Sequence, residues 1–335
     1  MYEAIKNFNK QFSYEPEIKN QKNFLTKKSS FVVVGMGGSA LAPLLLKTWR
    51  PELDIIIHRN YGLPELSLEK LKNNLIILSS YSGNTEEVID AFEKAKNKNL
   101  EFAVISTGGK LLSLAKENNV PYIELPNTGI QPRLALGLSI KAFLKLMGED
   151  NELKKLSVLA TTLNPSDYEK YGKVLAQKIK NYIPIIYASD HNLSLAYNWK
   201  IKLNETGKIP AFYNVFPELN HNEMTGFDTK DSTKELGNKF YFIILKDMGD
   251  DPKILKRMKT LKKLYEDRNL QTETIELKPA RNASHNDAGE EKNIWHKIFS
   301  SLVLADWTAY YTALEYGLEP EQVPMVEEFK KLILE

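Results

Sequence analysis

The sequence predicts an α/β protein with two units in tandem, each a parallel β-sheet flanked by helices. Three observations support this fold class. Short apolar runs without polar alternation recur along the chain, and such runs are typical of strands buried on both faces of a parallel sheet. Segments of helical periodicity separate these runs, as expected for strands joined by helical crossovers. The length of 335 residues corresponds to about two domains at roughly 150 residues each.

Apolar runs in the first half of the chain predict five strands. Their residues are Phe31–Val34, Leu53–Ile57, Leu75–Leu78, Phe102–Ile105 and Tyr122–Leu125. After the third run, a helix-start sequence at Asn84–Glu87 precedes apolar residues at helical spacing, namely Val88, Ala91, Phe92 and Ala95. This alternation predicts a doubly wound domain, which we assign to residues 20–150.

The second half repeats the alternation after a connecting segment, predicted to be helical, at residues 151–181. Further apolar runs predict strands at Ile183–Ala188, Ala211–Phe216, Phe240–Leu245 and Thr272–Leu277. Helices are predicted at Asn192–Leu203, at a long segment around 294–309, and at Val323–Leu334. The polar stretch Lys278–Lys292 predicts a loop. We assign residues 151–335 to a second domain of the same plan.

The composition excludes several classes of function. Basic residues number 45 and acidic residues 43, so the net charge of +2 gives no field for holding nucleic acid or a membrane surface. The absence of cysteine excludes disulfides, thiolate nucleophiles, zinc–thiolate sites and iron–sulfur clusters. No two of the five histidines have the helical spacing of a metal-binding pair, and we predict no metal site. Without a signal-peptide pattern or an apolar run of about 18 residues, we expect a cytoplasmic protein.

A glycine-rich segment, GMGGSA at residues 35–40, follows the first predicted strand. Glycines at such a turn let backbone N–H groups approach an anion, and the next helix adds the positive end of its dipole. Gly37, Gly38 and Ser39 are therefore candidate phosphate contacts. The spacing also fits a dinucleotide-binding turn, and Arg59 after the second strand would suit the 2′-phosphate of NADP. A tight turn without a ligand is the remaining alternative.

The segment after the third strand, SSYSGNTEE at residues 79–87, concentrates hydroxyl groups. Ser80, Ser82 and Thr85 lie within six residues, Gly83 permits a tight turn, and a helix is predicted directly afterwards. Hydroxyls beside a helix N-terminus form a neutral cradle for a phosphate group. Helix capping by Ser82 or Thr85, which contributes about 1 kcal/mol, explains one of these hydroxyls but not all three.

These two loops together resemble the sugar isomerase (SIS) domain, a phosphosugar-binding α/β module. Further segments resemble motifs of the bifunctional phosphoglucose/phosphomannose isomerases. Residues 130–137 (IQPRLALG) are similar to QPRxAxG, residues 198–208 (NWKIKLNETGK) to RWKxQLNENAK, and residues 218–223 (ELNHNE) to ExNHNE. The likeness extends from about residue 30 to the C-terminus, and the combination of motifs is specific.

The resemblance implies two SIS-type domains and an enzyme that interconverts glucose 6-phosphate, and mannose 6-phosphate as well, with fructose 6-phosphate through a cis-enediol. It implies that Glu205 is the base, that His221 opens the sugar ring, and that Arg133 stabilises the intermediate. Lys330, which has Lys331 as a neighbour, matches a lysine near the C-terminus of the family. In this family the histidine comes from the other subunit, which implies a homodimer. No cofactor is implied, because the proton moves within the substrate, and the implied pathways are glycolysis and gluconeogenesis.

Each of these residues also has a plainer interpretation. Glu205 lies near a predicted helix end and could be solvated, although burial would raise the pKa of a carboxyl group and suit it to act as a base. His221 has a side chain that titrates near neutral pH, but it could be an ordinary loop histidine. Arg133 could be a surface arginine near a predicted helix start, but its charge is slightly unfavourable there, so a functional role is favoured. Lys330 could be a solvated residue of a charged terminal helix.

Departures from the motifs and two rival functions stay open. Asn198 replaces the arginine before the tryptophan, and Thr206-Gly207 replaces Asn-Ala. In the second domain, Tyr187–Asp190 stands where the first domain has its glycine loop, which predicts one phosphate site per chain, in the first domain. The rivals are a phosphosugar sensor without catalysis and an NADP-dependent reductase that uses the glycine loop.

Overall fold

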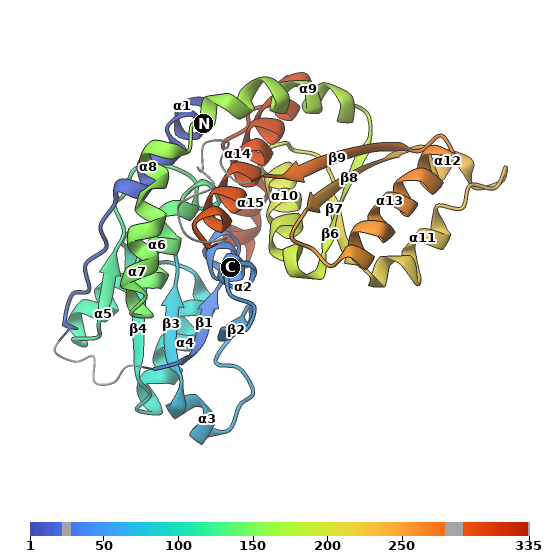
Figure 1. The fold of residues 1–335 in the computed structure, drawn as a ribbon. Coiled ribbons are helices and arrows are strands. Elements are labelled where there is room, and N and C mark those ends of the chain that lie inside the picture. Colours follow the sequence, from blue (N-terminus) through green and yellow to red (C-terminus); the bar gives the residue numbers. More distant parts are fainter. Residues whose placement is uncertain (22–27, 279–290, 334–335) are drawn as a thin grey trace. The chain divides into compact units, whose positions relative to one another are not determined.

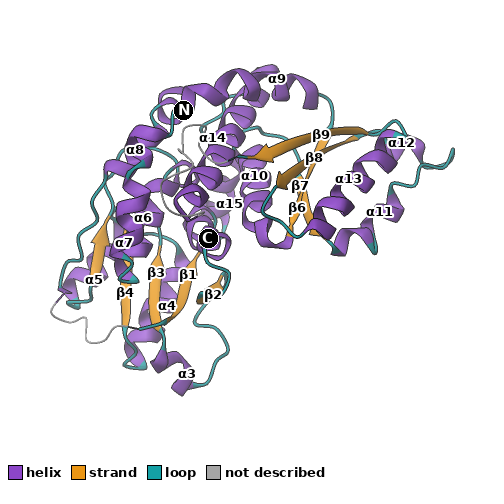
Figure 2. Cartoon of the chain, viewed as in Figure 1, coloured by secondary structure: helices purple, strands orange, loops and turns teal. Residues whose placement is uncertain are grey.

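The computed structural model describes residues 1–21, 28–278 and 291–333 (Figure 1). The chain divides into two compact units. The first unit comprises residues 7–163, and the second comprises residues 1–6 together with 164–335. The division lies after the helices α7 (Asp150–Ser157) and α8 (Leu159–Thr162), not at the expected position between residues 150 and 151. Helix α7 packs against helix α6 (Leu136–Leu146) of the first unit. Each unit contains its own sheet and helices (Figure 2).

A five-stranded parallel sheet with the order β2-β1-β3-β4-β5 forms the centre of the first unit. Its strands are β1 (Ser30–Gly35), β2 (Asp54–His58), β3 (Leu75–Ser79), β4 (Phe102–Ser106) and β5 (Tyr122–Glu124). Every residue of β3 and β4 is buried, as their apolar runs predict. The strand order reverses between β1 and β3, which pair from Phe31 opposite Leu75 to Gly35 opposite Ser79. Ligands of such sheets bind beyond the carboxyl ends of the strands at this switch point.

Helices cover both faces of this sheet. They are α2 (Gly38–Trp49), α3 (Leu68–Asn73), α4 (Glu86–Asn97), α5 (Gly109–Glu117) and α6 (Leu136–Leu146), with the 3-10 turns η1 (Phe8–Ser13) and η3 (Pro132–Leu134). The predicted periodicity of α4 is confirmed, because Val88, Ala91, Phe92 and Ala95 are all buried. These side chains form one core cluster with residues of α3, α5 and the central strands, while α2 and α6 pack against each other.

The second unit contains a four-stranded parallel sheet with the order β7-β6-β8-β9. Its strands are β6 (Ile183–Ser189), β7 (Phe212–Phe216), β8 (Phe240–Asp247) and β9 (Gln271–Leu277). The strand order reverses between β6 and β8, as it does between β1 and β3 in the first unit. The predicted α/β fold, with two parallel sheets of one plan, is therefore confirmed.

The second unit also contains the following helices. The longer ones are α9 (Glu169–Ile179), α10 (Leu193–Glu205), α13 (Pro252–Glu266), α14 (Glu291–Glu315) and α15 (Pro324–Leu332). The short elements are α1 (Tyr2–Lys6), α11 (Glu223–Gly226), α12 (Lys234–Gly237), η4 (Pro165–Tyr168), η5 (Asp190–Asn192) and η6 (Glu218–Asn220). Of the predicted loop Lys278–Lys292, residues 279–290 lie outside the described residues. Within the described ranges, no helix has both the length and the apolar character needed to cross a membrane.

Candidate active site

The glycine loop between β1 and α2 lies at the carboxyl end of the first sheet. Gly37 precedes α2 with a φ of 49°, and Ser39 lies in the first turn of this helix. A Cβ atom at position 38 would lie 2.6 Å from the Cβ atom of Pro132 and 3.0 Å from the backbone nitrogen of Arg133. Glycine at position 38 therefore allows the loop to approach the turn that carries Arg133.

The hydroxyl loop between β3 and α4 contacts the glycine loop. The Ser39 hydroxyl accepts a hydrogen bond from the Tyr81 N–H at 2.9 Å. The Ser80 and Ser82 hydroxyls accept from backbone N–H groups of their own loop, at 3.1 and 3.3 Å. Ser80 Oγ also lies 2.7 Å from Thr85 Oγ1, and this pair uses one of its two hydrogens internally. Within the described residues, Ser39, Ser82 and the Ser80–Thr85 pair therefore each keep one hydroxyl hydrogen for an external acceptor.

Helix capping does not explain these hydroxyls. Thr85 occupies the N-cap position of α4, but its side chain makes no capping hydrogen bond. The Ser82 hydroxyl bonds the N–H of Asn84, which precedes the helix. The result is a neutral group of donors close to the N-termini of α2 and α4, where the helix dipoles favour an anion.

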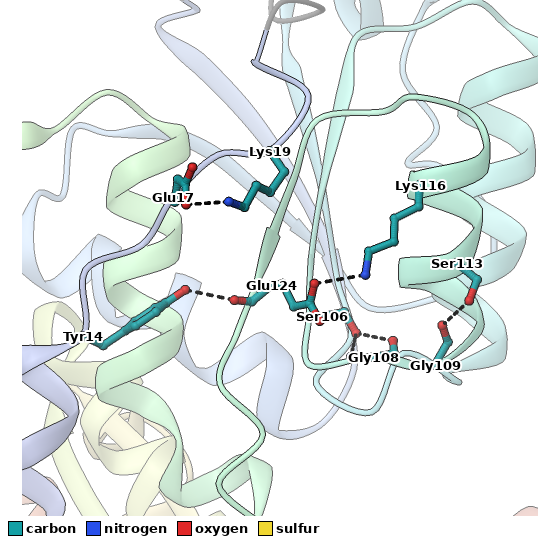
Figure 3. A network of polar contacts seen from close by, with 9 residues as sticks. All are labelled: Tyr14, Glu17, Lys19, Ser106, Gly108, Gly109, Ser113, Lys116 and Glu124. Carbon is teal, nitrogen blue, oxygen red and sulfur yellow. Dashed lines mark hydrogen bonds and ion pairs between the residues drawn. The ribbon is translucent and has the colours of Figure 1, made fainter.

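The loop after β4 supports the hydroxyl loop. Thr107 donates to the Tyr81 carbonyl oxygen from its N–H and from its hydroxyl, at 3.0 and 2.6 Å. The Ser106 hydroxyl donates to the Gly108 carbonyl oxygen at 2.8 Å (Figure 3). Gly83 has a φ of 72° and packs so closely that a Cβ atom there would lie 1.8 Å from this oxygen. Sequence reasoning gave this loop no part in the site, although its Ser-Thr-Gly-Gly pattern after a buried strand was a usable signal.

Arg133 lies in the turn η3 and is 1% exposed, so the interpretation as a surface arginine is wrong. A guanidinium group stays charged at physiological pH. Because η3 contacts Gly38, the first unit holds a buried, permanent positive charge in the turn beside the glycine loop. This charge can stabilise an anion that forms during a reaction.

Glu205 is the last residue of α10 and is partly buried within the second unit. Two contacts fix α10 to α14. Trp199 Nε1 donates to Ser301 Oγ at 3.0 Å, and Lys202 forms a buried ion pair with Asp306 at 2.5 Å. The glutamate is therefore carried by a helix whose position is fixed by packing, which suits a residue that must keep a defined geometry.

His221 follows the turn η6 and is exposed. Its imidazole makes no hydrogen bond or ion pair with any residue that the structure describes. Its neighbours are well connected, since Asn222 donates to Glu218 at 2.6 Å and Glu223 lies in a hydrogen-bond network with the sheet. The segment thus presents an available imidazole on a fixed backbone.

Lys330 lies on the surface of α15, a helix in which no residue is buried. Its side chain is 59% exposed and forms an ion pair with Glu327 at 2.8 Å. Lys331 is exposed on the same helix. The side chains of both lysines are long enough to reach beyond their own helix.

The structure gathers the candidates of the first unit at one edge of its sheet; these are Gly37, Gly38, Ser39, Ser80, Ser82, Thr85 and Arg133. The remaining candidates, Glu205, His221 and Lys330, belong to the second unit. Among the residues described, no three His, Asp or Glu side chains are grouped to hold a metal ion. The first unit by itself offers a cradle suited to a phosphate monoester.

Comparison with known proteins identifies the family of this chain. Residues 168–333 match a family model described as the bacterial phospho-glucose isomerase C-terminal SIS domain. A bifunctional phosphoglucose/phosphomannose isomerase from Aquifex aeolicus is 30% identical over 99% of this chain and 97% of its own length. A protein of the same name from Caldicellulosiruptor bescii is 30% identical over 100% of this chain and 99% of its own length.

A solved structure shares the fold. The C-terminal domain of glucosamine-fructose-6-phosphate aminotransferase from Francisella tularensis superimposes with a TM-score of 0.64 and covers 96% of each chain. Its sequence identity to this chain is 16%, so the likeness concerns the fold alone.

Proposed function

Because the chain belongs to the bifunctional phosphoglucose/phosphomannose isomerase family, we propose that it interconverts glucose 6-phosphate and mannose 6-phosphate with fructose 6-phosphate. The main structural support for this proposal is the neutral cradle of the first unit, whose hydroxyls keep hydrogens for an external acceptor. A phosphate bound by hydroxyls, N–H groups and helix N-termini is held without a basic side chain and can leave after the reaction. The family assignment argues against the NADP-dependent reductase.

The phosphate group would dock on the cradle formed by the two loops. Ser39, Ser82 and the Ser80–Thr85 pair donate hydroxyl hydrogens, and the backbone at Gly37 and Gly38 adds N–H groups. No phosphate bond changes during the isomerisation, so the cradle serves to position the sugar carbons. Binding energy at this remote group then orients the reacting centre.

We assign proton transfer between the sugar carbons to Glu205. Its carboxylate takes the proton from C2 of the open-chain aldose, the C–H electron pair forms a C1–C2 double bond, and the carbonyl oxygen at C1 gains negative charge. The same proton then returns to C1 while the O2 hydroxyl proton passes to O1, which gives the ketose without an external oxidant. Arg133 stabilises the cis-enediolate, because a buried guanidinium is in place before the charge develops.

We assign ring opening to His221, which gives a proton to the ring oxygen and accepts the proton of the O1 hydroxyl. Its exposed imidazole has no partner among the described residues, and this favours a role outside its own unit. We propose that it completes the active site of a second subunit, so that the enzyme acts as a homodimer. Lys330, or the adjacent Lys331, would add a positive charge to the same site. We propose that the enzyme acts in carbohydrate metabolism in the cytoplasm.

Replacing Glu205 with glutamine tests the proposal. We expect kcat to fall by about 10²- to 10⁴-fold, because the amide cannot accept the proton that a general base removes. Coupled assays on glucose 6-phosphate and mannose 6-phosphate in the presence of EDTA measure this effect, and circular dichroism checks the fold. Loss of activity on addition of EDTA would argue against a reaction that needs no metal ion.

Glu266→Gln is the matched control, because Glu266 is the last residue of α13 as Glu205 is of α10. We expect it to keep wild-type turnover. Near-wild-type turnover of folded Glu205→Gln would show that another residue is the base. Sugar-phosphate binding by the wild type without hydrogen exchange at C1 or C2 would identify a sensor instead.

A further inference from the structure

The segment that carries His221 is held to the second sheet through the carboxylate of Glu223. Tyr187 Oη donates to one carboxylate oxygen at 2.5 Å, and Asn214 Nδ2 donates to the other at 2.6 Å. Tyr187 of β6 and Asn214 of β7 are register partners in the parallel sheet. Two neighbouring strands therefore hold both oxygens of one side chain, two residues after the histidine.

The donor Tyr187 is itself fixed and stays protonated. It is fully buried, and its ring packs against Phe216 and Phe242 with centroids 6.1 and 5.6 Å away. Burial, and then the neighbouring Tyr265 and Glu223, raise the pKa of the Tyr187 phenol far above its usual value. The hydroxyl therefore donates its hydrogen to Glu223 throughout the pH range in which the protein works.

The remaining contacts of the segment lie in its backbone and in the residues on either side of His221. The His221 N–H donates to the Glu218 carbonyl oxygen at 2.9 Å, and the Asn222 side chain donates to the Glu218 carboxylate at 2.6 Å. The Glu223 N–H donates to the Asn222 side chain at 2.5 Å. Because the imidazole makes no such bond within the described residues, its position depends on these backbone anchors.

We propose that Tyr187, Asn214 and Glu223 form a clamp that positions His221 for proton transfer, and that Glu223 is a positioning residue. Both of its oxygens accept strong hydrogen bonds from the sheet, so the carboxylate is already engaged by Tyr187 and Asn214. The inference rests on the ring-opening role proposed for His221.

Tyr187→Phe tests the clamp, with Tyr265→Phe as the matched control. Tyr265 is also buried, and its hydroxyl lies 3.5 Å from that of Tyr187, but it makes no hydrogen bond to Glu223. Loss of the Tyr187 hydroxyl should lower kcat by about 10- to 100-fold with little change in KM, because displacing a catalytic group by about 1 Å has effects of this size. Tyr265→Phe should keep kcat near the wild-type value.

Hydrogen exchange of the amides of residues 218–226 gives a readout that does not depend on activity. Tyr187→Phe should accelerate exchange there, and Tyr265→Phe should not. Unchanged exchange in Tyr187→Phe would overturn the clamp, and faster exchange with unchanged kcat would overturn its positioning role. A wild-type enzyme without isomerase activity would refute the proposed function separately, since the exchange experiment would still report on the clamp.

Substitutions of Glu223 separate positioning from acid–base catalysis. A glutamine can accept from Asn214 through its oxygen and donate to Tyr187 Oη, because a phenol can accept as well as donate. Glu223→Gln should therefore keep most of the activity and the wild-type pH profile, whereas Glu223→Leu should lose both anchors and most of kcat. Equal loss in the two variants, or a missing limb in the pH profile of Glu223→Gln, would overturn the inference.

Discussion

The loops after β1 and β3 can be compared with the loops after β6 and β8, because both pairs flank the switch point of a sheet. In the first unit the two loops meet through a neutral contact, in which the Ser39 hydroxyl accepts from the Tyr81 N–H. In the second unit they meet through charged groups, since the Asn192 amide donates to Asp247 and Asp250 at 3.1 and 3.3 Å. The switch points of the two sheets thus hold different chemical groups, neutral in the first unit and charged in the second.

We refer to Ser189, Asn192, Asp247, Asp250 and Lys297 as the acidic cluster of the second unit. Lys297 of α14 pairs with Asp247 at 2.5 Å, and the Ser189 hydroxyl donates to Asp250 at 2.6 Å. The Ser189 hydrogen is therefore used inside the cluster, whereas Ser39, Ser82 and the Ser80–Thr85 pair of the first unit each keep one hydroxyl hydrogen. Two carboxylates that face one ammonium group do not attract a phosphate. One sheet plan can therefore serve as an anion site or as a closed ionic core.

The largest effect is expected when the acidic cluster loses its cation. Lys297→Met leaves the Asp247 carboxylate, 5% exposed, without its ion-pair partner. We expect the free energy of unfolding to fall by about 3 kcal/mol, because removing one member of a buried pair leaves an uncompensated charge. Urea denaturation at neutral pH measures this loss.

Lys246→Met is the control for this substitution. Lys246 is 30% exposed and lies 3.7 Å from Glu276, in an ion pair near the surface. Exposed pairs contribute little, so we expect little change in stability. Addition of Asp247→Asn to Lys297→Met should recover part of the loss, and a double variant as unstable as Lys297→Met would contradict the ionic interpretation.

Matched serines in the two units test which switch point binds phosphate. Ser80→Ala removes a hydroxyl of the Ser80–Thr85 pair, and we expect fructose 6-phosphate to bind about tenfold more weakly, the equivalent of one lost hydrogen bond. Ser189→Ala, which alters the acidic cluster, should leave the Kd unchanged. Calorimetric titration measures both values. If instead Ser189→Ala weakened binding and Ser80→Ala did not, the phosphate site would lie in the second unit.

Much of the fold could be predicted because its signals are local. The uninterrupted apolar runs predicted β3 and β4 within one residue at each end, and the spacing of Val88, Ala91 and Phe92 predicted α4. Short runs of this kind require burial on both faces wherever they occur in the chain. The phosphate loops could be proposed for the same reason, since their glycines and hydroxyls are adjacent in sequence.

The contacts that the sequence did not reveal join residues far apart in the chain. Arg133 is buried and its turn packs on Gly38, and Glu223 is held by a tyrosine 36 residues earlier. The ion pair of Lys297 with Asp247 spans 50 residues. Periodicity reports which face of an element is buried, but it does not identify the side chain that a polar group meets there.

The smallest predicted effect distinguishes the two carboxylates of the acidic cluster. Burial raises the pKa of Asp250 above its usual value of 3.8, and the nearby Asp247 adds to the shift, although the Ser189 hydrogen bond opposes it. The folded state therefore disfavours ionised Asp250, and this cost applies above the raised pKa and disappears as the pH falls below 3.8. We expect Asp250→Asn to stabilise the protein slightly near pH 7 and to have little effect near pH 3.

Asp247→Asn should have the opposite effect in the same denaturation series. Burial alone would raise the pKa of Asp247, but the Lys297 ammonium and the Gly249 N–H outweigh it, and the pKa lies below 3.8. Its ionised form therefore contributes stability that is present above pH 3.8 and is lost as the pH falls through the lowered pKa. The substitution should destabilise the protein near pH 7. If both substitutions changed the free energy of unfolding in the same direction, the ion pair with Lys297 would not be what separates Asp247 from Asp250. The difference between the acidic cluster and the neutral cradle would then rest on charge alone.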